Sequence, residues 1–187
     1  MEQSFSNKHK DSLLWQNLQR GNADALSQIY HQNAAFLVAY AGKLTANREI
    51  INDAIQDVFI NLWQKRNHLP PVQNVKAYLL KSLRNRILRI LEGRDLTGNG
   101  AQPHEGIQDS VEHRWIVEEL AEERLTRLHQ CMQNLPNRQQ EVINLRYFQN
   151  LKTEEIAEIL EINYQSVSNL LHKGIKALKK QIQSPQG

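Results

Sequence analysis

Apolar residues recur every three or four positions over most of this chain. That spacing collects them on one face of an α-helix, whereas a half-buried strand requires strict alternation. In the first half the pattern predicts helices over 13–18, 25–44, 50–63 and 75–91. In the second half it predicts helices over 111–134, 137–148, 153–160 and 164–181. No Asn-Gly or Asp-Gly pair joins two alternating apolar runs, so the sequence predicts an all-α fold.

A stretch without this periodicity divides the chain. Four of the eight glycines fall between Gly93 and Gly106, and no Lys or Arg occurs from Asp95 to His113. This composition is typical of a flexible acidic linker. We therefore expect two small helical domains, 1–94 and 113–187, joined by a linker over 95–112.

Charge follows the same division. The net charge over all 187 residues is only +3, but residues 1–94 carry 13 Lys/Arg and 7 Asp/Glu, a net of +6. Residues 95–134 have a net of −5 and residues 135–187 a net of +2. A basic, acidic, basic order indicates two modules that face nucleic acid and a segment that avoids it. Ordinary scatter of surface charge is the alternative interpretation.

Residues 153–180 have the pattern of a helix-turn-helix, with Thr153 and Asn163 suited to N-caps. The second helix is apolar on one side. Its polar positions are Gln165, Ser166, Ser168, Asn169, His172, Lys173 and Lys176. Such amides can pair with adenine near the start of a recognition helix, while later lysines meet guanine or phosphate. A solvated amphipathic face is the alternative.

The helix over 75–91 has a basic side. Lys81, Asn85 and Arg89 share one face, flanked by Arg84 and Arg86, and Glu92 is the one acidic residue between positions 76 and 94. A merely solvated face would usually interleave Glu with its Lys and Arg. The pattern therefore favours contact with a phosphate backbone or an exposed strand.

The helix over 50–63 has a different outer face. Its apolar stripe is Ile51, Ile55, Val58 and Leu62. Asp53, Gln56, Asp57 and Gln64 lie opposite, with Ile60 among them and Trp63 at the edge. An apolar residue beside a tryptophan on an acidic face fits a protein-docking patch, although it is also a common feature of ordinary surfaces.

Three segments together resemble bacterial RNA polymerase sigma factors of the extracytoplasmic-function (ECF) subgroup. They are DAIQDVFINLW (53–63), AYLLKSLRNRILRI (77–90) and LPNRQQEVINLRYFQNLKTEEIAEILEINYQSVSNLLHKGIKALKK (135–180). The resemblance spans roughly residues 13–181. Glu161 stands where this family often has glycine, and Arg89 where an Asp is frequent.

The resemblance implies a promoter-specificity factor with two partners, core RNA polymerase and promoter DNA. It implies that Asp53, Gln56, Asp57, Ile60 and Trp63 bind the polymerase. Segment 65–73, with Lys65, Arg66 and Asn67, would capture an unstacked base of the −10 element, while Lys81, Arg84, Asn85 and Arg89 hold the adjacent backbone. The helix-turn-helix residues, Gln165 to Lys176, would read the −35 element. Members of the subgroup are commonly held by an anti-sigma factor, although no residue here identifies one.

Other functional classes fit less well. A stand-alone helix-turn-helix regulator is the alternative, but it has no need of the 53–63 and 77–90 segments. The chain lacks the motifs of common enzyme and metal sites, and His129 and Cys131 lie two apart on a helix and so do not face each other. We therefore expect no enzyme activity, cofactor, metal or small-molecule substrate. The lack of an apolar signal core and the single cysteine predict a cytoplasmic protein without membrane insertion.

Overall fold

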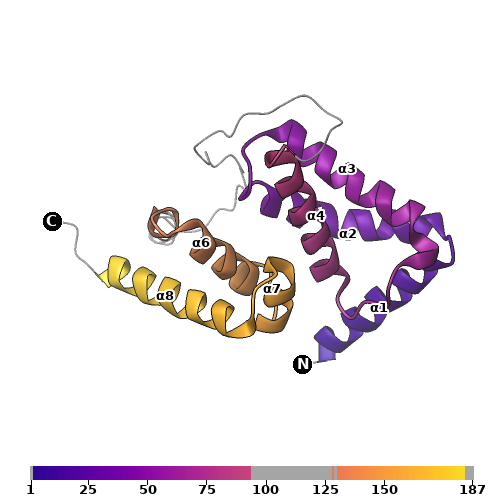
Figure 1. The fold of residues 1–187 in the computed structure, drawn as a ribbon. Helices are drawn as coiled ribbons and strands as arrows, with labels where there is room; N and C mark the ends of the chain where they lie inside the picture. Colours follow the sequence, from indigo (N-terminus) through magenta and orange to yellow (C-terminus); the bar gives the residue numbers. More distant parts are fainter. Residues whose placement is uncertain (1, 94–127, 129, 184–187) are drawn as a thin grey trace, which may run out of the picture. The chain divides into compact units, whose positions relative to one another are not determined.

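The computed structural model describes residues 2–93, 128 and 130–183, which belong to two separate units, 1–108 and 109–187 (Figure 1). Every regular element in these described ranges is helical, which confirms the all-α prediction. The first unit contains α1 (Glu2–Gln19), α2 (Ala23–Ala41), α3 (Arg48–Gln64), a short 3-10 helix (Arg66–His68) and α4 (Val75–Leu91). The second contains α6 (Asn137–Ile143), a π-helical turn (Asn144–Phe148), α7 (Thr153–Leu160) and α8 (Tyr164–Gln183). The predicted linker and most of the predicted 111–134 helix lie outside the described residues.

Asparagine N-caps begin three helices of the first unit. Oδ1 of Asn22 accepts a hydrogen bond from the Ala25 N–H at 3.1 Å, and Oδ1 of Asn47 accepts one from the Glu49 N–H at 2.9 Å. Oδ1 of Asn74 accepts one from the Ala77 N–H at 3.1 Å. Each cap satisfies a backbone N–H that the first helical turn leaves without a partner. The helix starts are therefore set locally by the chain.

The core of the first unit is built from one face of each helix. The four residues predicted as the apolar stripe of α3 are all buried, with exposed fractions of 7% or less. They pack with the largest fully buried side chains, which are Trp15, Leu18, Ile29, Leu37, Tyr40, Leu79, Leu80, Leu83 and Ile87. This packing leaves the opposite face of α3 and part of the opposite face of α4 at the surface, where the predicted sites lie.

In the second unit α6 and α8 cross closely at a buried glycine. A Cβ on Gly174 would lie only 2.8 Å from Cδ1 of Ile143, so a larger residue here would require a shift. The close crossing fixes α8 against α6. Because Val167 on the same helix is fully buried, the polar side of α8 is directed outward.

The turn between α7 and α8 differs from the sequence prediction at its first cap and agrees at its second. Thr153 is the first residue of α7 rather than its N-cap; Lys152 takes the cap position, and its N–H donates to Oε2 of Glu155 at 2.7 Å. Asn163 does cap α8, since its Oδ1 accepts from the Ser166 N–H at 2.7 Å. Between them Glu161 has φ 55° and ψ 41°, the left-handed conformation that glycine adopts most easily.

Candidate nucleic-acid and protein interfaces

The outer face of α3 keeps an exposed apolar side chain among polar ones. Ile60 is 43% exposed, and Asp53 and Gln56 are also exposed. Asp57 is placed differently, because its Oδ2 accepts from Arg86 Nε at 2.7 Å and lies 2.6 Å from Arg86 Nη2. The pair joins α3 to α4. The structure therefore divides the predicted set into three exposed residues, the half-buried Trp63 and one carboxylate engaged within the unit.

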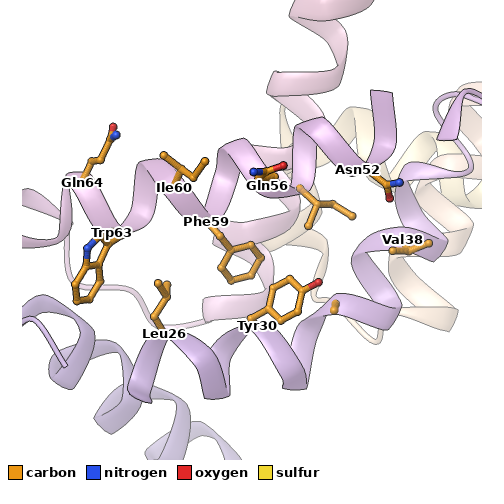
Figure 2. A pocket seen from close by; sticks show the side chains of 11 residues that line it. Leu26, Tyr30, Val38, Asn52, Gln56, Phe59, Ile60, Trp63 and Gln64 are labelled. Carbon is orange, nitrogen blue, oxygen red and sulfur yellow. The ribbon is translucent and has the colours of Figure 1, made fainter. Parts of the chain in front are cut away.

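Behind this face lies an open apolar groove between α2 and α3, with a volume of about 610 Å³ (Figure 2). Tyr30 and Val38 of α2 are 43% and 47% exposed, and the Tyr30 ring meets the Phe59 ring edge-on at 5.1 Å. All of its lining residues are uncharged: Leu26, Tyr30, Ala34, Val38, Asn52, Ile55, Gln56, Phe59, Ile60, Trp63 and Gln64.

Sequence reasoning missed the α2 wall of this groove. Leu26, Tyr30, Ala34 and Val38 follow one another at intervals of four residues, so they form a second apolar stripe beside the buried one. That spacing was the available signal. A helix with two apolar stripes has more apolar surface than its own core needs, and here the surplus lines the groove.

The segment after α3 carries exposed basic and polar residues. Lys65, Asn67 and His68 are exposed. Arg66 is half-buried: its guanidinium lies 4.4 Å from the centre of the Trp63 ring, and its Nη1 donates to the Trp63 carbonyl at 2.7 Å. This stacking fixes Arg66 at the base of the segment and covers one side of the tryptophan.

The predicted basic face of α4 is only partly at the surface. Arg89 is exposed, and Lys81 and Asn85 are half-buried. Arg84 is buried, at 9% exposure. The structure therefore does not bring Arg84 to the surface with the other three, and we leave it out of the candidate interface.

Perturbed pKa values occur at the N-terminal turn of α4. Burial lowers the pKa of Lys76, whose ammonium lies 4.4 Å from the centre of the Phe36 ring. Burial raises the pKa of Tyr78, an effect opposed by its hydrogen bond with Ser82. Both shifts follow from packing in the unit.

The polar side of α8 presents the predicted reading residues. Gln165, Asn169, His172, Lys173 and Lys176 are exposed, and Ser166 and Ser168 are half-buried. Gln165 Nε2 donates to Asn169 Oδ1 at 3.2 Å, so the two amides are joined one turn apart. Each of the two side chains is oriented by its hydrogen bond to the other.

Exposed aromatic residues near this helix were not identified from the sequence. Tyr164, at the start of α8, is 53% exposed, and Tyr147 and Phe148 in the π-helical turn are 61% and 55% exposed. Tyr147 continues the helical period of the residues before it, so no signal in the sequence marked these side chains as exposed. Within the part of the chain that is described, His, Cys, Asp and Glu form no group of three that could hold a metal ion. No described helix has the length and hydropathy needed to span a bilayer.

Two family models match successive parts of the chain. The model for sigma-70 region 2 matches residues 29–109, and the model for sigma-70 region 4 matches residues 125–178. The ECF RNA polymerase sigma factor SigK of Mycolicibacterium vanbaalenii is 23% identical over 172 residues, which cover 91% of this chain and 87% of that protein. A stand-alone helix-turn-helix regulator does not account for the region 2 match.

Two solved structures share the fold. One, described as CnrH in complex with the cytosolic domain of CnrY, has a TM-score of 0.62 at 19% identity, covering 94% of this chain and 99% of the other. The other, described as the sigma factor RpoE with the anti-sigma factor NepR from Bartonella quintana, has a TM-score of 0.54 at 18% identity, covering 86% and 98%.

Proposed function

Because the chain belongs to the ECF type of sigma-70 family sigma factors, which direct transcription initiation through RNA polymerase, we propose that its two units divide that task. Such factors bind core polymerase and promoter DNA and are not enzymes. We assign polymerase binding and −10 opening to residues 1–94 and −35 reading to residues 113–187. The activity requires a cytoplasmic location, where polymerase and chromosome meet.

The polymerase-binding surface in this proposal is the outer face of α3. The observation that carries it is Ile60, 43% exposed between acidic and amide side chains at the lip of the apolar groove. An exposed apolar side chain with a polar rim is the usual centre of a protein interface. Asp53, Gln56 and Trp63 complete the surface. Asp57 contributes through its ion pair with Arg86, which holds α3 against α4.

The −10 surface in this proposal consists of the segment after α3 and the exposed end of α4. Lys65, Asn67 and Arg89 are exposed, and residues 65–73 contain no Asp or Glu. Cations and amides without neighbouring acids suit an unwound, phosphate-rich strand. Lys81 and Asn85 lie on α4 between this segment and Arg89. Unstacking a base costs a few kcal/mol, which binding energy offsets without ATP.

The −35 surface is the polar side of α8. The hydrogen-bonded pair of Gln165 and Asn169 lies at the N-terminal half, where recognition helices meet base edges. His172, Lys173 and Lys176 follow toward phosphate. Replacement of Asn169 by Ala should alter base preference, whereas Lys176→Ala should reduce the salt dependence of binding without changing preference.

The groove between α2 and α3 is our candidate site for an anti-sigma factor. The two solved structures reported above were determined with a second protein bound. The groove is uncharged and open, so it suits an apolar segment of a partner. Gln56, Ile60 and Trp63 line it and also belong to the proposed polymerase surface, so occupation of the groove would block polymerase.

The test is run-off transcription with purified core polymerase and this protein, with the transcripts sequenced to map both promoter elements. Ile60→Asp should weaken core binding at least tenfold, because it places a charge in a desolvated contact. Leu13→Asp is the matched control, since Leu13 is 55% exposed on α1, away from this surface. Equal binding by wild type and Ile60→Asp, or equal loss in both variants, would contradict the assignment of α3.

A further inference from the structure

The segment between α3 and α4 is held by side chains of α1. Nε1 of Trp15 donates a hydrogen bond to the Pro70 carbonyl at 2.9 Å, and Nε2 of Gln19 donates one to the Leu69 carbonyl at 2.7 Å. The donors lie one helical turn apart, and the acceptors are consecutive carbonyls. One face of α1 therefore binds two successive peptide units of this segment. The acceptors lie 55 positions after Trp15 and 50 positions after Gln19.

These two hydrogen bonds constrain a segment that can form few backbone hydrogen bonds of its own. Pro70 and Pro71 have no N–H, so this part of the segment cannot form helical backbone pairs. The local order consists of the 3-10 turn, where the His68 N–H donates to the Lys65 carbonyl at 2.8 Å. Without the donors on α1, the chain after this turn could adopt more conformations.

The same part of α1 also relates the segment to its flanking helices. Trp15 is 2% exposed, and its ring meets the Tyr78 ring of α4 at 5.0 Å in an edge-on arrangement. At the beginning of the segment Arg66 stacks on Trp63 of α3. A Cβ on Gly21, the second residue after α1, would lie 3.5 Å from Arg66 Nε. The segment is thus fixed against α1 and α3, and α1 in turn packs on α4.

We propose that Trp15 and Gln19 are positioning residues for −10 recognition, which hold segment 65–73 in the arrangement that selects one unstacked base. The inference rests on the proposed −10 function of that segment. Trp15 and Gln19 act through the two carbonyls and need not touch DNA. A segment held in one arrangement cannot adjust its contacts to fit other bases, so the difference in affinity between bases is larger than for a segment that is free to rearrange.

The test compares two glutamines of α1. Gln19→Met keeps the length and helix propensity of the side chain and removes the donor. Gln16→Met is the matched control, because Gln16 is an exposed glutamine of the same helix and its substitution leaves the Gln19–Leu69 bond in place. Gln19→Asn, whose amide is one methylene too short to reach Leu69, tests the same bond while keeping a polar side chain.

The readout is base selectivity in the assembled polymerase holoenzyme. Affinity is measured for a single-stranded oligonucleotide carrying the mapped −10 element and for versions substituted one base at a time. A net hydrogen bond changes an equilibrium constant about three- to tenfold, so Gln19→Met and Gln19→Asn should lower the cognate-to-substituted ratio by that factor at one position. Gln16→Met should keep the wild-type ratio, and core binding should stay unchanged in all three variants.

Three outcomes would overturn the inference. In the first, the ratio is unchanged in both Gln19 variants. In the second, affinity falls equally for all oligonucleotides, which would indicate a general structural role. In the third, wild-type holoenzyme itself shows no base preference on this strand, which would overturn the proposed −10 function as well.

Discussion

Glu161→Gly should stabilise the helix-turn-helix. Glu161 ends α7 in the left-handed conformation, at φ 55° and ψ 41°, and its N–H donates to the Ala157 carbonyl. For a residue with a Cβ this conformation costs roughly 1–2 kcal/mol. Glycine removes that cost but loses about 0.5–1 kcal/mol through the greater freedom of the unfolded chain. We therefore expect a net gain of about 0.5–1 kcal/mol in the free energy of unfolding of the second unit.

The chain contains a matched control for this substitution. Asn150 has φ 54°, almost the same as Glu161, and lies in the same unit before α7. Asparagine tolerates the left-handed region better than other residues with a Cβ, because its short amide can bond to nearby backbone. Asn150→Gly relieves less strain at the same entropic cost, so its effect should be close to zero.

Hydrogen exchange in the full chain measures this difference unit by unit. Under conditions where exchange reports the opening equilibrium, the gain corresponds to about two- to fivefold slower exchange of the most protected amides of α6 and α8. Amides of α3 should keep their wild-type rates, because α3 belongs to the other unit. If Glu161→Gly exchanges as fast as Asn150→Gly, or faster than wild type, backbone strain at this turn is not what limits stability.

Three further predictions concern stability. Gly174→Ala should lower the free energy of unfolding of the wild type by about 1 kcal/mol, since its Cβ would lie 2.8 Å from Ile143 Cδ1. It should not destabilise a chain that carries Ile143→Val, because valine lacks that methyl group. A double-mutant cycle by urea denaturation measures this coupling, and additive effects of the two substitutions would show that the contact is irrelevant. Asp57→Asn should lower the free energy of unfolding by about 1 kcal/mol, because it weakens the ion pair with Arg86 of α4. Asp53→Asn should instead reduce core-polymerase affinity with little change in stability. Equal stabilities of the two variants in urea would contradict this difference. Because burial lowers the pKa of Lys76 from its ordinary 10.5, the folded state binds fewer protons there than the unfolded state, so the cost of burying the charge is greatest at lower pH and fades as pH rises toward 10.5. The stability of wild type relative to Lys76→Met should accordingly rise as the pH approaches 10.5 from below, and a flat difference in urea denaturation would refute the burial argument.

Helix positions were readable from the sequence because each helix is coded locally. The period of apolar residues predicted a helix over 75–91, and α4 has those bounds because Asn74 supplies its cap. The first predicted helix began only at Leu13, whereas α1 begins at Glu2, because residues 2–12 are mainly polar and give no apolar period. The π-helical turn was likewise invisible, since its residues continue a pattern that an α-helix also satisfies.

Burial at the flanks of a helix was not readable, because it depends on neighbours. On a helical wheel Arg84 and Arg86 both flank the basic face of α4. In the structure Arg84 is buried at 9% exposure, while Arg86 reaches Asp57 on α3. Which of the two arginines is buried and which forms an ion pair depends on how α2 and α3 pack against α4. The stacking of Arg66 on Trp63 is a similar case, because it depends on how the chain turns after α3.

The geometry of α3 bears on how the proposed polymerase and anti-sigma sites are related. Gln56, Ile60 and Trp63 belong to both, since they line the groove and form the outer face, so one α3 substitution cannot separate the two kinds of binding. Tyr30 and Val38 line the groove from α2 and take no part in the proposed polymerase surface. Competition for shared side chains would let one partner exclude the other without any change in the shape of the unit. Because a helix has a narrow surface, a partner that fills the groove against α3 must cover the residues that polymerase needs.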